Sequence, residues 1–402
     1  MLGMGRSPRP TNVKGVIRGP EYDAGGTGDR ALMDALFADA GQGDVHALIA
    51  EHATFGCRHR VAESVLRSRT TRAPSMPQTT DPMFELLQRF MARVDGDRHQ
   101  AVRALFARVF TPRRAARYRT DIEQRSHALI DRVEADGAMD LVADYARPLP
   151  FGIIADVLGV PAASHPWLEE AFGVLGAAFA GQRDPARVVA GNAAATELIE
   201  FFDRLFVERA THPADDLITL LASDDNSTVD RGDLLANCVF FMLAGHTTST
   251  TLLTAGATTL LEYPHQLRAL MDHPPRWSTA VDELVRFVSP ITLTGVGLDD
   301  DIVIDGENFR AGANRLICYA GANRDREVFD DPDRLDITRT PNPHLGFSVG
   351  AHHCVGAPLA RLNAEVGMSV LFHRLPDLHT AGLPVWTGHA PVRQIVSQPV
   401  RW

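Results

Sequence analysis

The sequence predicts a mainly α-helical protein with small β-sheets, and three features of the chain support this fold class. Apolar residues recur three and four positions apart over most of the chain up to about residue 285, as they do on the buried face of a helix. The stretch 290–320 alternates and turns like a small hairpin, and a Val-rich stretch ends the chain as a second β region. We expect one domain, residues 1–402, with α-rich parts at about 60–285 and 320–375 and β-rich parts at about 288–320 and 376–402.

The helical part follows residues 1–30, which are rich in Gly and Pro and are expected to be irregular. Helical spacing is clear in the pair Leu105 and Val109 and again in the pair Leu198 and Phe202. Breaks between helices are predicted where prolines interrupt the pattern, at Pro148, Pro150, Pro161, Pro213, Pro274 and Pro275.

Two further helices and one irregular segment are predicted in the C-terminal half. A long helix is expected at about 231–262 and a closing helix at about 357–374, with Pro358 in its first turn, where proline is favoured. Between the hairpin and the closing helix, residues 322–353 are rich in Pro, Asp and Asn. Because an irregular segment of this length is unusual inside a compact domain, it indicates a functional role.

The charge and the lack of long apolar stretches exclude several classes of partner. The formal net charge of −10 argues against nucleic acid, because phosphate binding requires a basic surface. The N-terminus lacks the apolar core of a signal peptide, and no stretch approaches the ~18 apolar residues of a membrane span. We therefore expect a cytoplasmic protein that binds neither nucleic acid nor a membrane.

One segment runs against the overall charge. No acid occurs between Asp97 and Asp121, yet this stretch holds Arg98, Arg103, Arg108, Arg113, Arg114, Arg117 and Arg119. These arginines form either a solvated helix face or a docking patch for an acidic protein.

One of the four cysteines stands in an unusual setting. Cys57, Cys238 and Cys318 are interpreted as small buried hydrophobic residues, and no Cys-x-x-Cys pair supports a zinc site. Cys354 instead lies just before the predicted closing helix, among glycines that permit tight turns: Gly346, Gly350 and Gly356. The free amides and dipole of a helix N-terminus favour a thiolate, which is the form that binds metal. A glycine-cradled thiolate is what ligation of a haem iron requires, whereas the nearby His344, His352 and His353 match no common zinc spacing.

Two other constellations carry possible chemistry. In the predicted long helix, the Thr248 hydroxyl lies four residues after Ala244 and could bond its carbonyl, which would open a kink beside Gly245. Taken alone, such hydroxyls more often bond only their own helix. Glu283 and Arg286 lie three apart on one helix face, the usual spacing of a surface ion pair.

The Cys354 loop resembles the haem loop of the cytochrome P-450 family, Phe-x-x-Gly-x-x-x-Cys-x-Gly. Phe347, Gly350, Cys354 and Gly356 match it without a gap, and Ser348 stands where the family usually has glycine. The resemblance extends from about residue 50 onward. It implies the triangular, mainly helical fold of this family, enclosing haem b between the long helix and the helix that follows its axial ligand, Cys354.

The resemblance also implies roles for the other constellations. Residues 244–248 are similar to the oxygen-binding groove, in which Thr248 would hydrogen-bond dioxygen and steer protons. Thr247 stands where the family usually has an acid, so a proton would pass its hydroxyl only within a chain of waters. Glu283 and Arg286 resemble a buried structural pair whose third member would be Arg334. His99, Arg103 and His352 would bind the haem propionates, whereas Val296 occupies the position of a further propionate arginine.

A haem-thiolate monooxygenase that hydroxylates or epoxidises an apolar or aromatic small molecule in secondary metabolism is the favoured interpretation. The alternatives are an enzyme of oxidative coupling, cyclisation or desaturation, which the Thr247 change would suit, and a non-enzymatic haem sensor or carrier, which has no need of the Thr248 groove. Electrons would come from a ferredoxin and its ferredoxin reductase. The expected substrate pocket contains Phe84, Phe90, Phe179, Phe241, Ala244, Ile291, Leu293 and Ile395.

Overall fold

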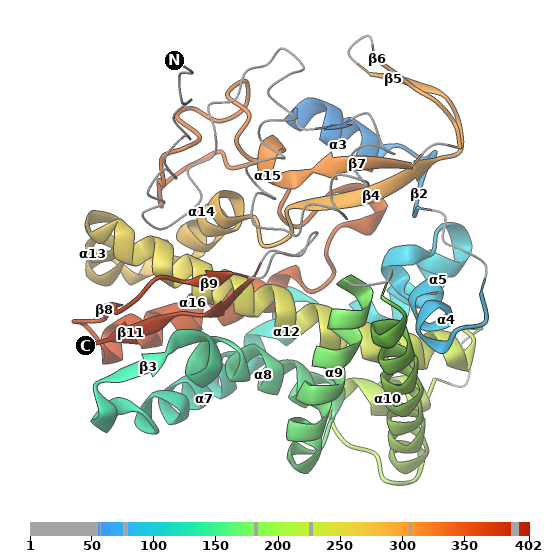
Figure 1. Cartoon of the computed structure of the whole chain (residues 1–402), viewed down its shortest axis with the longest axis horizontal. Helices are drawn as coiled ribbons and strands as arrows, with labels where there is room; N and C mark the ends of the chain where they lie inside the picture. Colours follow the sequence, from blue (N-terminus) through green and yellow to red (C-terminus); the bar gives the residue numbers. More distant parts are fainter. Residues whose placement is uncertain are drawn as a thin grey trace, which may run out of the picture.

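A helix of 32 residues, α12 (Arg231–Glu262), runs through the middle of the protein (Figure 1). The computed structural model describes residues 55–56, 58–74, 79–180, 184–224, 228–304, 307–312, 314–386 and 394–402. The predictions for residues 1–30 and for Cys57 lie outside these residues. None of the described helices combines the length and the apolar composition needed to cross a membrane.

The mainly helical class with small sheets is confirmed. Besides α12, the helices are α3 (His59–Arg67), α4 (Pro82–Arg89), α5 (Gly96–Ala107), α6 (Pro112–Ala115), α7 (Arg119–Asp131), α8 (Pro148–Leu158), α9 (His165–Ala180), α10 (Pro185–Thr211), α11 (Leu217–Ala222), α13 (Pro264–Asp272), α14 (Trp277–Val288), α15 (Tyr319–Ala322) and α16 (Ala357–Arg374). Several begin with proline, whose fixed φ and missing amide suit the first helical turn. The predicted long helix and closing helix coincide with α12 and α16.

The strands form small sheets around the helical part. One sheet has the order β1 (Phe55–Gly56), β7 (Asn314–Cys318), β4 (Leu293–Leu298), β2 (Thr71–Arg72), and a second has β3 (Ala138–Asp140), β11 (Pro399–Arg401), β8 (His379–Thr380). The predicted hairpin is β5 (Ile302–Ile304) with β6 (Glu307–Phe309), paired Ile302 to Phe309, and the chain ends with β9 (Val385–Trp386) paired to β10 (Ile395–Ser397).

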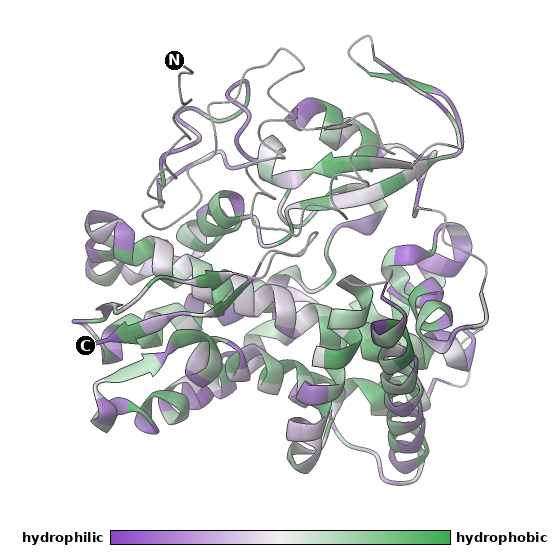
Figure 2. Cartoon of the chain, viewed as in Figure 1, coloured by the Kyte–Doolittle hydropathy of each residue, from purple (hydrophilic) through white to green (hydrophobic). Residues whose placement is uncertain are grey.

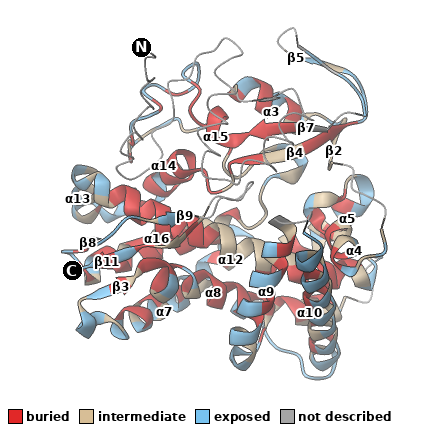
Figure 3. Cartoon of the chain, in the orientation of Figure 1, coloured by how far each residue is buried: buried red, intermediate tan, exposed pale blue. Residues whose placement is uncertain are grey.

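The core lies where α12 meets its neighbours. Apolar residues of α8, α14 and α16 pack around α12, and Figure 2 shows green, apolar segments directed toward this centre. In Figure 3 the same segments are buried, whereas the outer sides of α7, α10 and α13 are exposed. Between α15 and the turn η7 (Gly350–His352), residues 323–349 form neither helix nor strand, as predicted.

Candidate active site

A cavity of about 320 Å³ lies between α12 and the loop that precedes α16. The α12 side is formed in part by Ala244, Gly245 and Thr248. As the spacing predicts, the Thr248 hydroxyl donates to the Ala244 carbonyl oxygen at 2.8 Å. A side chain at Gly245 would press on Ile154, because an added Cβ would lie 3.0 Å from its Cγ1. The close approach of α8 therefore favours glycine at this point of the wall, because any larger residue would displace the Ile154 side chain.

Thr247, the residue in place of the usual acid, is not part of the cavity wall formed by the described residues. Its hydroxyl lies 3.4 Å from Nε2 of His246. Nδ1 of that ring contacts the Met242 carbonyl oxygen at 2.7 Å and so carries the proton. The pKa of His246 is lowered to about 4, chiefly by burial, so the ring is neutral and Nε2 accepts from Thr247.

The Cys354 loop supplies another part of the wall. Phe347, Cys354 and Gly356 line the cavity, and the Cys354 amide donates to the Phe347 carbonyl oxygen at 2.8 Å. Gly350 lies outside the wall and adopts φ +75°, and a Cβ there would overlap the Leu66 carbonyl oxygen. Ser348 adopts φ 55°, the left-handed conformation that explains why glycine suits this position. The glycine pattern thus reflects the path of the loop around the cysteine.

The Cys354 thiol experiences opposing influences. Burial raises its pKa, while the amides of Gly356 and Ala357 and the charges of Arg103 and Arg361 lower it. Burial prevails, and the pKa lies above the ordinary value. The amides at the start of α16 therefore favour the thiolate, as predicted, but do not outweigh burial, and a coordinated metal ion would supply the further stabilisation of the thiolate.

Three predicted cofactor ligands meet at one edge of the cavity. The rings of His99 and His352 lie 4.3 Å apart, and Arg103 donates to the carbonyl oxygen of His353 at 2.7 Å. Nε2 of His99 is buried without a hydrogen-bond partner among the described residues. Burial, followed by the charges of His352 and Arg103, lowers the pKa of His99 to about 4. Val296 also lines the cavity, and its side chain has no hydrogen-bond donor. His99, Arg103 and His352 are therefore the predicted donors at this edge.

These residues fit a haem. Cys354 faces the cavity, and a Cβ added at Gly356 would meet only its Sγ, at 3.9 Å, so the backbone leaves this side open. The unpartnered Nε2 of His99 and the guanidinium of Arg103 are donors suited to carboxylates, which haem carries at one edge.

The predicted substrate pocket is only partly correct. Of its members, Phe241, Ala244 and Ile291 line the cavity. Phe90 and Phe179 lie behind the wall, where Phe90 packs against Phe179 and against the wall residue Phe240 at centroid distances of 6.2 and 5.0 Å. Phe84 likewise packs against the core without reaching the described wall. The apolar character of Phe84, Phe90 and Phe179 indicated that they are buried. It did not indicate whether they lie in the cavity wall or behind it.

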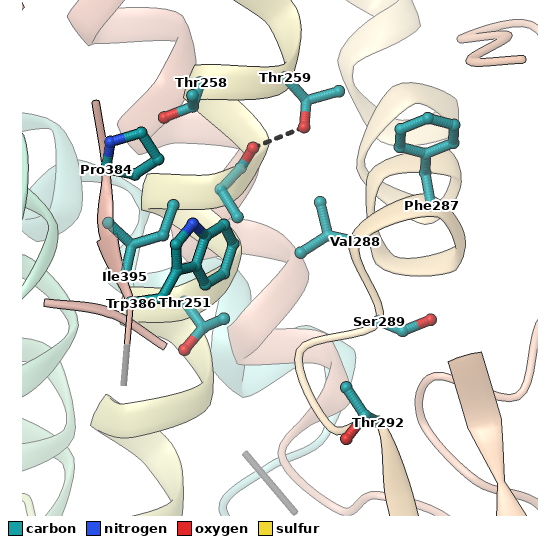
Figure 4. A pocket seen from close by; sticks show the side chains of 11 residues that line it. Thr251, Thr258, Thr259, Phe287, Val288, Ser289, Thr292, Pro384, Trp386 and Ile395 are labelled. Atoms are coloured by element: carbon teal, nitrogen blue, oxygen red, sulfur yellow. Dashed lines mark hydrogen bonds between the residues drawn. The ribbon is translucent and has the colours of Figure 1, made fainter. Parts of the chain in front are cut away.

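Two of the predicted pocket residues nearer the C-terminus, Leu293 and Ile395, also lie outside this cavity wall. On β4, Thr294 and Val296 line the cavity while Leu293 does not, because alternate side chains of a strand point to opposite faces. Ile395 lies in a separate pocket of about 20 Å³ with Trp386 and Thr251. Figure 4 shows side chains of α12, of the end of α14 and of β9 and β10 around this small pocket.

The cavity wall also includes a short turn that a residue of α12 holds in place. Met91 and Ala92, in the short turn η1 (Met91–Arg93), line the cavity. Asn237 of α12 holds this turn, because its side-chain oxygen accepts from the Met91 amide at 2.7 Å and its nitrogen donates to the Arg89 carbonyl at 3.0 Å. The only feature of the sequence that could have indicated this contact is Asn237 itself, a lone Asn in an apolar stretch.

Glu283 and Arg286 form a fully buried pair, and Arg339 rather than Arg334 completes it. Glu283 accepts from Arg286 at 2.7 and 2.8 Å and from Nε of Arg339 at 3.1 and 3.2 Å. The prediction for Arg334 is wrong, because its side chain is 63% exposed, 3.9 Å from Asp331. Only the backbone carbonyl of Arg334 reaches the network.

Most of the arginines from Arg98 to Arg119 are engaged within the protein. Their partners are Asp233 for Arg98, the His353 carbonyl for Arg103, Asp224 for Arg108, Asp215 for Arg117 and Glu365 for Arg119. The guanidinium groups of Arg113 and Arg114 have no hydrogen bond or ion pair with the described residues. They lie on α6, which packs against α16.

Comparison with known proteins agrees with this geometry. The family model of cytochrome P-450 matches residues 275–376. The mycinamicin IV hydroxylase/epoxidase of Micromonospora griseorubida is 34% identical over 371 residues, 88% of this chain and 90% of that protein. The nocardicin C N-oxygenase of Nocardia uniformis subsp. tsuyamanensis is 35% identical over 321 residues, 78% of this chain and 79% of that protein.

Solved structures share the fold. The structure of P-450BioI with a hexadec-9Z-enoic acid ligated acyl carrier protein superposes with a TM-score of 0.83 at 29% identity, covering 87% of this chain and 91% of that one. Its match extends beyond the region that the family model covers. With a relative 34% identical over 88% of its residues, the chain belongs to the cytochrome P-450 family of haem monooxygenases.

Proposed function

We propose that this chain is a haem-thiolate enzyme that hydroxylates or epoxidises an apolar or aromatic small molecule of bacterial secondary metabolism. The observation that carries the proposal is a single cavity whose wall includes both Cys354 and, from α12, Ala244, Gly245 and Thr248. Similarity to a mycinamicin IV hydroxylase/epoxidase favours oxygen insertion. The aliphatic and aromatic side chains of the wall favour an apolar substrate.

In this proposal, Cys354 binds the iron of haem b through Sγ. Bound there, the haem supplies the activation of dioxygen and the oxidation of the substrate. His99, Arg103 and His352 hold its carboxylates, and the Phe347 carbonyl fixes the Cys354 backbone. The Phe347 ring is itself held, because the Arg361 guanidinium lies 4.3 Å from its centre.

Proton delivery is assigned to Thr248 rather than to Thr247. Thr248 is on the cavity wall, and while its hydroxyl donates to the Ala244 carbonyl, its Oγ1 can accept a hydrogen bond from a water and so hold that water in the cavity. Ser249 also lines the cavity and offers a second hydroxyl. The Thr247 hydroxyl is directed to His246 and holds no proton for the cavity.

A second candidate function follows from the absence of an acid at position 247. Without an acid at position 247, delivery of protons is slower, and this favours oxidative coupling, cyclisation or desaturation of the substrate without oxygen insertion. Mass spectrometry of products formed under ¹⁸O-labelled dioxygen distinguishes the two reactions. Incorporation of one labelled atom supports oxygen insertion, and its absence from a turned-over product supports the second candidate.

We further propose a ferredoxin, reduced by a ferredoxin reductase, as electron donor. Arg113 and Arg114 support this donor, because their guanidinium groups have no charged partner among the described residues and so offer positive charge beside α16, the helix that follows Cys354. Charge reversal of both should raise the KM for a ferredoxin without changing substrate affinity. An unchanged KM would exclude this face as its docking site.

The principal test is the spectrum of the reduced, carbon monoxide-bound protein. We expect the long-wavelength Soret band of thiolate-ligated haem and its loss in Cys354→Ala. Cys238→Ala, which changes a buried cysteine of α12 outside the cavity wall, should keep the band and serves as the control. A band typical of histidine-ligated haem in the folded wild-type protein would overturn the proposal.

A further inference from the structure

The side chain of Asp95, at the start of α5, does not make the hydrogen bonds that are usual for an Asp at a helix N-terminus. Asp95 is the N-cap residue of α5, where an Asp side chain ordinarily accepts from the first free amides of the helix. It makes no such bond. Instead, one oxygen accepts from the Ala73 amide at 2.7 Å and the other from Nε2 of His352 at 2.8 Å. When a stable fold breaks a local rule in this way, the site is often functional.

Both partners of Asp95 belong to the cavity wall, although Asp95 itself does not. Ala73 lies just after β2, and His352 lies two residues before Cys354. The carboxylate therefore joins the beginning of α5 to two segments that are far away in the sequence. Burial raises the pKa of Asp95, but the bonds from His352 and Ala73 outweigh it and hold the pKa below its ordinary value. Asp95 is thus ionised at neutral pH and can accept both bonds.

The bond to Asp95 also determines how the His352 ring is presented. Because Nε2–H donates to Asp95, Nδ1 is the ring nitrogen left for a group in the cavity, and it donates to a carboxylate when the ring carries a proton on both nitrogens. The ring packs against His99 at 4.3 Å, so fixing one imidazole limits the movement of the other. Both rings and Arg103 line the same edge.

We propose that Asp95 is a positioning residue for the haem, because it fixes His352 and the segment ending at Ala73 at the edge where the haem carboxylates bind. This inference rests on the proposed function, which supplies the occupant of the cavity. The expected size of the effect can be taken from carboxylates that hydrogen-bond to metal-binding histidines and orient them. Their loss typically lowers metal affinity roughly 10–100-fold.

The test is the rate at which the holoenzyme transfers haem to excess apomyoglobin. Asp95→Ala should release haem about tenfold faster than the wild type or more. Asp95→Asn retains one acceptor oxygen and should release it at an intermediate rate, which guards against a folding defect in the alanine variant. Asp97→Asn, which changes an exposed acid two residues further along, is the matched control and should stay within about twofold.

A double-variant cycle separates this role from general stabilisation. If Asp95 acts through His352, Asp95→Ala should accelerate haem release several-fold less in a His352→Ala background than in the wild type. An equal effect in both backgrounds, or release from Asp95→Ala at the wild-type rate, would overturn the proposal. The spectrum of the reduced, carbon monoxide-bound protein distinguishes failure of this inference from failure of the proposed function. Asp95→Ala should keep the band of thiolate-ligated haem. Only the absence of that band from the wild type contradicts the proposed function.

Discussion

At the scale of single residues, the Glu283 network shows which part of the site a sequence can reveal. Glu283 and Arg286 are three apart on one helix, so their contact follows from helical geometry. The third member of the network lies in the irregular segment. There, no regular spacing along the sequence indicates the direction in which a side chain points. Arg334 and Arg339 are five residues apart, and only the path of the backbone decides that Arg339 faces inward.

This assignment gives a paired stability prediction. Arg339→Met should lower the free energy of unfolding by roughly 3 kcal/mol, because it removes a partner from the buried Glu283 carboxylate. Arg334→Met, on the exposed side of the same segment, should change it by less than about 0.5 kcal/mol. Denaturant unfolding of both variants provides the measurement, and equal losses would contradict the assignment of Arg339.

At the scale of elements, the helices and the Cys354 loop were predictable because their causes are local. Apolar spacing and prolines set the bounds of α12 and α16, and glycine marks the turn before the cysteine. The cavity wall was less predictable. Phe90 and Met91 are neighbours in the sequence, yet only Met91 reaches the cavity, because Asn237 fixes its backbone from 146 positions away.

The loop itself supports a prediction about Gly350. Gly350→Ala should destabilise the protein by more than the ~1 kcal/mol typical of a positive φ, because the added Cβ would also overlap the Leu66 carbonyl. Gly312→Ala is the control: Gly312 has φ +76° but open space around it, so only the conformational cost applies. Thermal unfolding of the two variants should therefore give a larger loss at Gly350, and similar losses would show that the loop can shift.

At the scale of the whole molecule, carboxylates connect segments that are far apart in the chain. Asp233 of α12 holds Arg89 and Arg98, and Asp282 of α14 holds Arg361. The pKa values of both acids lie below the ordinary value, because the hydrogen bonds and charges of their partners outweigh burial. No sequence pattern predicted these links, since each partner is more than 70 positions away.

These pKa shifts make the stability depend on pH. A carboxylate with a lowered pKa in the folded state stabilises the protein above the unfolded value, 3.8, and this contribution is lost as the pH falls through the folded value. We therefore expect Asp233→Asn to lower Tm clearly at pH 7, and this loss to shrink progressively as the pH falls below 3.8 toward the lowered pKa of the folded state. Asp272→Asn, at an exposed end of α13, should show no such difference. A Tm loss that is independent of pH would mean that Asp233 acts by packing alone.

The buried Arg286 has a consequence for how this protein can diverge. Besides Glu283, its guanidinium binds the backbone carbonyl oxygens of Asn323 and Pro332, at 2.8 and 2.9 Å. Because a carbonyl is present whatever the side chain, substitutions at many positions of the irregular segment leave these contacts intact. A deletion or insertion moves the carbonyls themselves. Apart from residues whose side chains bind Glu283, such as Arg339, related sequences should therefore vary in composition here while they conserve the length of the segment.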